Sequence, residues 1–143
     1  MTARRIDVSD ELLAEIIEHE GMMFSMYDCP AGYKTIGVGH NLEAKPITER
    51  AAIVILEDDV ADCLADLDRA FPWWVSLPKD AREVLINMCF NMGIGRLSAF
   101  KRMWAALEAK DYYEASQEML DSKWAKQVGR RAKYLSEKMR NCA

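Results

Sequence analysis

A helix that must stop at Gly21, followed by a short glycine-rich β segment, constrains the fold of this chain more than any other feature. Ser9 is a good helix N-cap, and apolar residues recur after it at helical spacing as far as Glu20. A glycine directly after such a segment commonly ends the helix. The sequence therefore predicts a helix over residues 9–20, with the carboxylic acid of Glu20 at its end.

Residues 23–40 have the pattern of a β-hairpin. Pro30-Ala31-Gly32 supplies the turn, and the segment Thr35-Ile36-Gly37-Val38-Gly39 alternates small and branched residues. No other part of the chain has a convincing β pattern. We therefore expect one small β element, with Cys29 on the hairpin and facing a cleft.

The rest of the chain is predicted to be helical, which gives an α+β fold class. A long helix is expected over residues 48–70, because apolar residues follow one stripe of it. The expected stripe consists of Ile53, Leu56, Val60, Cys63, Leu64 and Leu67. Further helices are expected between Pro78 and Gly93 and over about residues 98–109, 111–121 and 129–140.

Length and composition exclude several classes of protein. A chain of 143 residues fits one domain with a sizeable core. Its net charge of −4 gives no general reason to expect a nucleic-acid partner. No stretch has the roughly 18 consecutive apolar residues needed to span a bilayer, and the N-terminus lacks the apolar segment of a signal peptide. We therefore expect the protein to be made in a cytoplasm and not to span a membrane.

The four cysteines do not form a metal-binding pattern. They are scattered and include no Cys-x-x-Cys pair, so we expect no zinc site, no other metal and no cofactor. Cys63 and Cys89 occur in apolar helical patterns and are expected to be inert core residues.

Glu20, Cys29 and Thr35 form the candidate catalytic set. Eight residues separate Glu20 from Cys29, and five separate Cys29 from Thr35. This arrangement can place an acid on one wall of a cleft and a nucleophile or a water-holding group on the other. Asp28 is an alternative second group, but a shift of one residue along a strand turns a side chain to the other face. We therefore favour Cys29.

The segment from Glu20 to His40 resembles the catalytic segment of phage-type lysozymes, glycoside hydrolase family 24, in the subset that has Cys in place of the second catalytic Asp. The resemblance extends through the segment Asn87–Gly93 to Ser122-Lys123-Trp124 and Gly129-Arg130-Arg131-Ala132. It implies a single lysozyme-like domain over residues 1–143. Its expected parts are a small β lobe (21–47), a connecting helix (48–70) and a helical lobe (71–143) that helix 9–20 joins.

The same resemblance implies supporting roles for three further residues. His40 would form a hydrogen bond near the floor of the cleft, and Asn91 would contact sugar. Arg131 would pair with Glu20, which leaves Arg130 exposed. Trp124 is expected to be a core aromatic residue.

By this resemblance the protein is a muramidase that hydrolyses the β-1,4 bond between N-acetylmuramic acid and N-acetylglucosamine. Glu20 would act as the general acid, and Cys29 and Thr35 would act on the attacking side. The expected substrate is bacterial peptidoglycan, and the protein would be a monomer released from the host cytoplasm through a holin-type pore. Delivery inside a virion is the alternative.

Three other functions remain open from the sequence. A lytic transglycosylase would use Glu20 alone and leave an anhydro sugar. A Cys/His amidase or peptidase would use Cys29 and His40, although such enzymes normally present the cysteine at the start of a helix. A non-catalytic peptidoglycan-binding protein would keep the fold without the activity.

Overall fold

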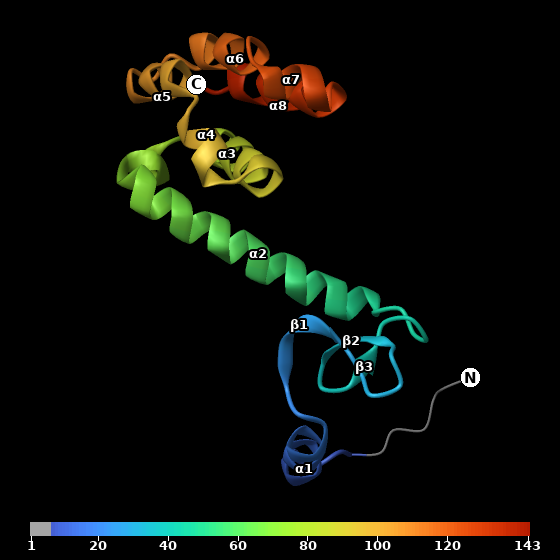
Figure 1. Cartoon of the computed structure of the whole chain (residues 1–143). Helices are drawn as coiled ribbons and strands as arrows, with labels where there is room; N and C mark the ends of the chain where they lie inside the picture. Colours follow the sequence, from blue (N-terminus) through green and yellow to red (C-terminus); the bar gives the residue numbers. More distant parts are fainter. Residues whose placement is uncertain (1–6) are drawn as a thin grey trace, which may run out of the picture. The chain divides into compact units, whose positions relative to one another are not determined.

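The structure is a computed structural model that describes residues 7–143 (Figure 1). The chain divides into two compact units, one up to Ala52 and the other over Ile53–Ala143. Each unit is described in turn.

The first unit begins with helix α1 (Asp10–Glu20). The Ser9 hydroxyl accepts a hydrogen bond from the backbone N–H of Leu12 at 3.2 Å, which satisfies one of the free N–H groups at the helix start. Gly21 ends the helix with a φ of 77°, and its N–H donates to the carbonyl of Ile17 at 2.7 Å. The helix predicted over residues 9–20 is therefore confirmed, with Glu20 as its last residue.

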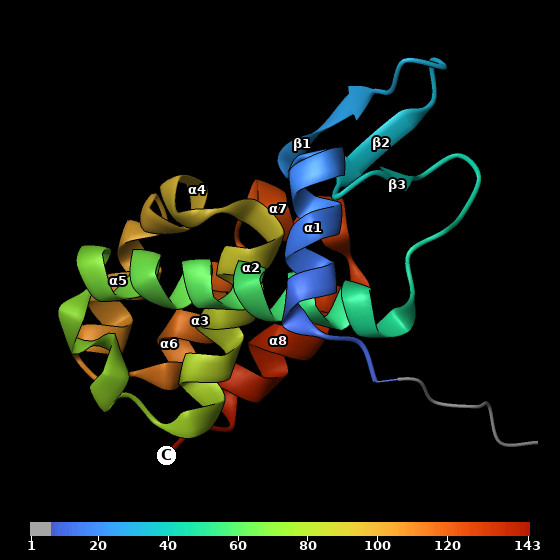
Figure 2. The same cartoon turned by 90° about the horizontal axis from the view of Figure 1, so that it is seen from below.

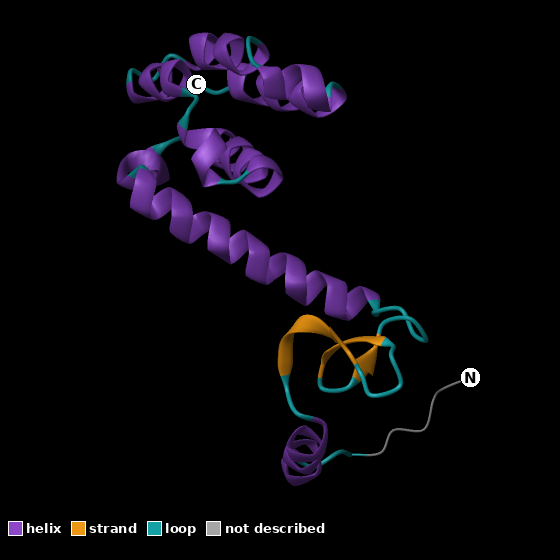
Figure 3. Ribbon diagram, in the orientation of Figure 1, coloured by secondary structure: helices purple, strands orange, loops and turns teal. Residues whose placement is uncertain are grey.

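A three-stranded antiparallel sheet follows, drawn in orange in Figure 3. Strand β1 (Met23–Asp28) pairs with β2 (Lys34–Gly37), which pairs in turn with β3 (His40–Asn41). Thr35 lies opposite Tyr27 on β1 and opposite Asn41 on β3, so it occupies the central strand. The expected hairpin is confirmed, and the sequence pattern did not reveal the short third strand.

The long helix α2 (Glu49–Ala70) begins next to the Thr48 side chain, whose hydroxyl accepts a hydrogen bond from the N–H of Ala51 at 3.1 Å. Of the apolar stripe predicted for this helix, only Cys63 and Leu67 are buried. Ile53 and Leu56 are not part of the core of the second unit, so the predicted stripe packs into that core only in the C-terminal half of the helix.

The second unit contains the C-terminal part of α2 and a set of shorter helices. These are the 3-10 helix η1 (Pro72–Ser76), α3 (Lys79–Met92), α4 (Ile94–Ser98), α5 (Lys101–Glu108), α6 (Tyr112–Leu120), α7 (Lys123–Val128) and α8 (Arg130–Arg140). Helix α6 packs against α5 and α8, and α8 also packs against α3 and α7 (Figure 2).

The core of this unit is rich in methionine and leucine. Met88, Met103, Met119 and Met139 are fully buried, and each comes from a different helix. Unbranched methionine fills irregular gaps between helices that cross at different angles. Cys63 and Cys89 are also buried, as predicted, and burial raises the pKa of Cys89 to about 12.

Two short helices were not predicted from the sequence. Helix α4 begins directly after Gly93, which ends α3, and α7 has only six residues. Both are too short to show a full helical repeat of apolar residues. The helix expected over about 98–109 is α5, and those expected over 111–121 and 129–140 are α6 and α8, each within a few residues of the predicted ends.

The predicted α+β class is confirmed by one small sheet followed by a mostly helical remainder (Figure 3). Between residues 7 and 143, no helix combines the length and the apolar character required to cross a membrane.

Candidate active site

Glu20 lies at the point where α1 ends, and its carboxyl group lies against Gly39 in the tight turn between β2 and β3. A Cβ atom built on Gly39 would fall 2.6 Å from Oε2 of Glu20. Gly39 also has a φ of 67°, a backbone conformation that residues with a side chain rarely adopt. Glycine at residue 39 therefore allows both the turn and the close approach of the Glu20 carboxyl group.

Cys29 is the first residue after β1 and lies in the turn that joins β1 to β2. Its N–H donates to the carbonyl of Tyr33 at 2.9 Å, and its carbonyl accepts from the N–H of Gly32 at 2.7 Å. Cys29 therefore lies on the hairpin, as predicted, in its turn and not within a strand. The turn holds this residue through its backbone, so the alternation of strand faces does not decide which way its side chain points.

The sulfur of Cys29 receives backbone N–H groups from its own turn. The N–H of Tyr33 donates to Cys29 Sγ at 3.4 Å. This hydrogen bond lowers the pKa of the Cys29 thiol, because it stabilises the negatively charged thiolate. Partial burial opposes the shift, and the N–H groups of Ala31 and Gly32 support it. Converging N–H groups of this kind form a small anion-binding concavity.

Thr35 is buried on the central strand β2, with 2% of its surface exposed. Its hydroxyl donates to the carbonyl of Tyr33 at 2.8 Å. A hydroxyl group has a single proton, so Thr35 would have to turn away from that carbonyl to donate to Cys29 instead. The Thr35 hydroxyl also contributes to lowering the pKa of the Cys29 thiol. Thr35 therefore adjoins the sulfur and can act on it.

Asp28, the alternative to Cys29, has a different partner. Its carboxylate forms an ion pair with the ammonium group of Lys34 at 2.7 Å, across the β1–β2 pair. Both side chains are at least half exposed. This ion pair engages one oxygen of the Asp28 carboxylate at the surface.

His40 lies on β3, and its Nε2 is 3.0 Å from the carbonyl oxygen of Lys45. Because a carbonyl can only accept, Nε2 donates this hydrogen bond. His40 thereby holds the loop after β3, which the side chain of Asn41 also fixes by accepting from the N–H groups of Glu43 and Ala44. Within residues 7–143 no hydrogen bond joins His40 to Cys29.

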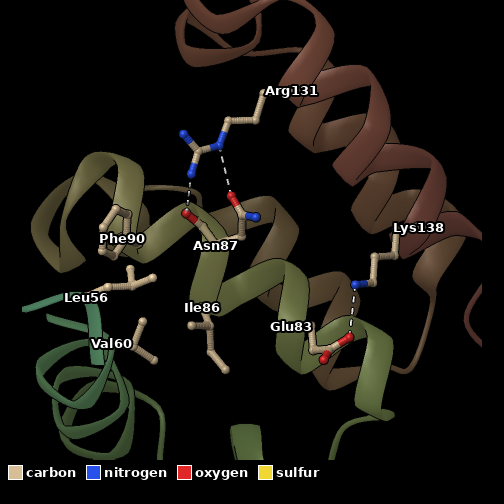
Figure 4. Close-up of a pocket in the computed structure, with 8 residues that line it drawn as sticks. All are labelled: Leu56, Val60, Glu83, Ile86, Asn87, Phe90, Arg131 and Lys138. Carbon is tan, nitrogen blue, oxygen red and sulfur yellow. Dashed lines mark hydrogen bonds and ion pairs between the residues drawn. The ribbon is translucent and has the colours of Figure 1, made fainter. Parts of the chain in front are cut away.

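The remaining predicted residues belong to the second unit. Arg131 reaches from α8 to α3, where its Nε donates to Oδ1 of Asn87 at 2.9 Å (Figure 4). A second guanidinium nitrogen lies 3.4 Å from the backbone carbonyl of Asn87. Arg130 is exposed, as predicted.

Arg131 borders a hollow of about 510 Å³ in the second unit. Its lining includes the apolar side chains of Leu56, Val60, Ile86 and Phe90, all labelled in Figure 4. At its charged end Lys138 forms an ion pair with Glu83 at 3.0 Å, and this pairing lowers the pKa of Glu83. Asn87 supplies the two acceptors that Arg131 uses here, a partnership that the sequence pattern did not predict.

Asn91, near the end of α3, accepts a hydrogen bond from the indole N–H of Trp124 at 2.7 Å. Trp124 is 3% exposed, so the prediction that it is a core aromatic residue is confirmed. The Asn91 oxygen is thus engaged inside the protein. Its amide N–H₂ is the part of the side chain that remains to bind a ligand.

The predicted site residues fall in both units. Glu20, Cys29, Thr35 and His40 belong to the first unit, and Asn91 and Arg131 belong to the second. The pairing of Arg131 with Glu20 would join the two units and stays a prediction, as does the single domain in which helix 9–20 joins the helical lobe. The backbone N–H of Tyr33 is a site group that sequence reasoning missed. The only available signal was its place after the Pro30-Ala31-Gly32 turn.

Comparison with known proteins relates this chain to phage lysozymes and endolysins. Residues 17–141 match the family described as phage lysozyme, which covers most of the chain. An endolysin from Acyrthosiphon pisum secondary endosymbiont phage 1 is 30% identical over 122 residues, covering 83% of this chain and 80% of the endolysin. A probable T4-type lysozyme from Dictyostelium discoideum is 28% identical over 144 residues, covering 79% of this chain and 84% of that protein.

A third relative is a larger protein. The pre-baseplate central spike protein Gp5 of Enterobacteria phage T4 is 28% identical over 149 residues. The match covers 84% of this chain but 26% of the spike protein.

Proposed function

The chain belongs to the phage lysozyme family, a family of glycoside hydrolases, and we propose that it is a muramidase acting on bacterial peptidoglycan. The bond cleaved would be the β-1,4 bond between N-acetylmuramic acid and N-acetylglucosamine. The endolysin and lysozyme names of its relatives support this class of activity.

Glu20 would be the general acid. It would donate its proton to the glycosidic oxygen while the bond from that oxygen to the anomeric carbon breaks. The end of α1 and the turn at Gly39 support this role, because together they hold the carboxyl group in a defined place. A catalytic group needs such a fixed position.

Cys29 and Thr35 would act on the attacking side. In one form of the reaction Cys29 Sγ bonds to the anomeric carbon, and water then displaces the sulfur. In the other form the two side chains hold a water molecule that attacks the anomeric carbon directly and gives up a proton to the Cys29 thiolate. The lowered pKa of Cys29 supports both forms, because a thiolate is a stronger nucleophile and a stronger hydrogen-bond acceptor than a thiol.

The backbone cradle at Cys29 is the observation that carries this proposal. The N–H of Tyr33 points at Cys29 Sγ, and the Thr35 hydroxyl adjoins it, so the sulfur has the surroundings of an activated group. An inert cysteine that only filled space would be expected in apolar surroundings, like those that raise the pKa of Cys63 and Cys89.

Two routes would bring the protein to the cell wall. A free endolysin would reach the wall from the host cytoplasm through a holin-type pore, and we propose this version with the protein as a monomer. The similarity to a phage spike protein supports the other version, in which the protein is carried with the virion. Mass spectrometry of purified virions would distinguish the two, because only the second predicts peptides of this chain in the particle.

The activity can be tested on purified peptidoglycan. Wild type should release soluble fragments, and Glu20→Gln should release them at least about a hundredfold more slowly, because the amide cannot supply the proton. Glu18→Gln is the matched control, since Glu18 lies on the same helix and is also exposed. Equal rates for wild type and Glu20→Gln would reject the proposed acid.

A further inference from the structure

One peptide group, between Tyr33 and Lys34, joins the surroundings of Cys29 to the rest of the small sheet. We call it the Tyr33–Lys34 peptide. Its carbonyl oxygen accepts two hydrogen bonds, from the backbone N–H of Cys29 at 2.9 Å and from the Thr35 hydroxyl at 2.8 Å. The N–H on the other side of Tyr33 donates to Cys29 Sγ at 3.4 Å. The orientation of this peptide group therefore affects the Cys29 backbone, the Thr35 hydroxyl and the N–H donor at the sulfur.

A carboxylate holds the N–H side of the Tyr33–Lys34 peptide. The N–H of Lys34 donates to Oε2 of Glu43 at 2.5 Å. A hydrogen bond to an ionised acceptor is roughly twice as strong as one between neutral groups. Because the N–H and the C=O belong to one planar unit, a bond that fixes the N–H also fixes the direction of the carbonyl.

Glu43 takes the place of a strand neighbour at this point. The register of the sheet places Thr35 opposite Asn41. One residue further along, the N–H of Leu42 still donates to the carbonyl of Lys34 at 2.8 Å, as in a continuing strand. Strand β3 ends at Asn41, however, and the N–H of Lys34 donates to the Glu43 side chain. This side chain therefore continues the hydrogen-bond ladder where the backbone of β3 turns away.

The loop after β3 holds Glu43 in the position that this bond requires. The side chain of Asn41 accepts from the N–H groups of Glu43 and Ala44, both at 3.0 Å, which is the pattern of an Asx turn. Nε2 of His40 donates to the carbonyl of Lys45 at 3.0 Å. The backbone of Glu43 is thus fixed from both sides, so its carboxylate loses less conformational freedom when it binds the sheet.

An ordinary surface ion pair does not account for this contact. The ammonium group of Lys34 pairs with Asp28 at 2.7 Å, across the β1–β2 pair. The hydrogen bond and the charge of Asp28 raise the pKa of Lys34, and the charge of Glu43 adds a smaller effect in the same direction. Glu43 therefore acts mainly on the backbone of residue 34 and not on its side chain.

We propose that Glu43 is a positioning residue for Cys29 and Thr35. Its carboxylate holds the Tyr33–Lys34 peptide, and this peptide holds the Cys29 backbone and the Thr35 hydroxyl. The importance of this role for catalysis rests on the proposed function. The role itself does not, because the ionisation of the Cys29 thiol is measurable without any substrate.

Two variants of Glu43 isolate the hydrogen bond. Glu43→Gln removes the charge but keeps an oxygen that can accept from the Lys34 N–H, whereas Glu43→Ala removes both. The rate of Cys29 alkylation by iodoacetamide, measured against pH, follows the thiolate form. Loss of a nearby negative charge lowers the pKa of a thiol, and this effect is common to both variants.

The two variants should differ in the midpoint of this alkylation profile. In Glu43→Ala the Tyr33 N–H is no longer held toward the sulfur, so the pKa of Cys29 should rise and the midpoint should move to higher pH. In Glu43→Gln the midpoint should stay close to that of wild type. A role confined to stability would leave both midpoints in place. Equal midpoints in the two variants would overturn the proposal.

The backbone amide signal of Lys34 in nuclear magnetic resonance gives a second reading that does not need Glu43→Ala to fold. In wild type, lowering the pH protonates carboxylates and weakens the hydrogen bond that they accept, so the Lys34 signal should move. In Glu43→Gln this movement should be lost. The same movement in both proteins would assign it to Asp28 and contradict the proposed bond.

Activity separates this inference from the proposed function. Glu43→Ala should release peptidoglycan fragments at least about tenfold more slowly than Glu43→Gln, because a misplaced catalytic group reacts more slowly. If the Cys29 midpoints differ as expected but wild type releases no fragments, Glu43 positions Cys29 and the muramidase proposal fails. If wild type cleaves peptidoglycan and the two midpoints are equal, the muramidase proposal stands and the role of Glu43 is rejected.

Discussion

The carboxyl group of Glu20 and the backbone of Gly39 lie so close that a Cβ atom at residue 39 would fall 2.6 Å from Glu20 Oε2. Two parts of the small unit, the end of α1 and the β2–β3 turn, meet at this contact. A glycine far from Glu20 in the sequence therefore fixes where the proposed catalytic acid can lie.

Gly39→Ala should reduce activity by more than its cost in stability explains. The added methyl group would displace the Glu20 carboxyl group, and a misplacement of about 1 Å can cost roughly a hundredfold in rate. The positive φ of residue 39 should also cost about 1–2 kcal/mol of stability. Rates of peptidoglycan release and thermal unfolding, measured on the same variants, check both effects.

Gly37→Ala is the control for that experiment. Gly37 has a φ of 68°, almost the same as the 67° of Gly39, but a Cβ atom there would have no neighbour within 4 Å. Its variant should share the loss in stability and keep most of the activity. If the two variants lose the same activity, the contact with Glu20 does not matter for catalysis.

Alkylation by iodoacetamide should select Cys29 among the four cysteines. The thiolate is the form that reacts, so a lowered pKa gives a larger reactive fraction at neutral pH. Burial raises the pKa of Cys142, Cys63 and Cys89 and has the opposite effect. The rate at Cys29 should therefore rise with pH around a midpoint below that of an ordinary thiol, and the rate at Cys142 around a higher one.

Peptide mapping by mass spectrometry at several pH values gives these rates residue by residue. The prediction requires Cys29 to be modified first at pH 7. A Cys29 that reacts more slowly than Cys142 at that pH would show that the Tyr33 N–H does not stabilise its thiolate in solution.

The same reagent should inactivate the enzyme through Cys29. Cys29→Asp should retain activity and resist the reagent, because a carboxylate can attack or hold water and is not alkylated under these conditions. Cys142→Ser should remain as sensitive as wild type. Equal sensitivity of wild type and Cys29→Asp would exclude Cys29 as the target that matters.

Asn91→Ala should destabilise the second unit. It removes the acceptor of the Trp124 indole N–H, and an unsatisfied buried donor costs about 1–3 kcal/mol. Asn91→Asp keeps an oxygen acceptor and should be less destabilising.

The double variant Asn91→Ala with Trp124→Phe should lose less stability than the sum of the losses of its single variants, because the donor disappears together with its acceptor. Unfolding in urea measures wild type and the four variants, and strictly additive losses would mean that this hydrogen bond contributes nothing.

Local signals in the sequence predicted the first unit well. Ser9 and Gly21 define the ends of α1 because capping depends on neighbouring residues alone. Pro30-Ala31-Gly32 likewise indicates a turn at the correct place. The place of Cys29 on the hairpin was also predicted. The end of β1 one residue before Cys29 was not, because strand ends depend on pairing with β2 more than on residue preference.

Contacts between distant residues account for what the sequence did not show. The approach of Glu20 to Gly39, the bond from Arg131 to Asn87 and the bond from Trp124 to Asn91 each depend on how separate elements pack. Spacing along the chain carries no information about such pairs. Helical periodicity likewise predicted the stripe that contains Ile53 and Leu56, but not which part of it packs into the core of the second unit.

The chemical nature of the ends produced from purified peptidoglycan tests the central claim most directly. Mass spectrometry of fragments from wild type should show reducing N-acetylmuramic acid ends, and these should disappear with Glu20→Gln. Anhydro-muramic ends would contradict hydrolysis and indicate a lytic transglycosylase in which Cys29 takes no part. The absence of any sugar cleavage would leave a peptidoglycan-binding protein with the lysozyme fold.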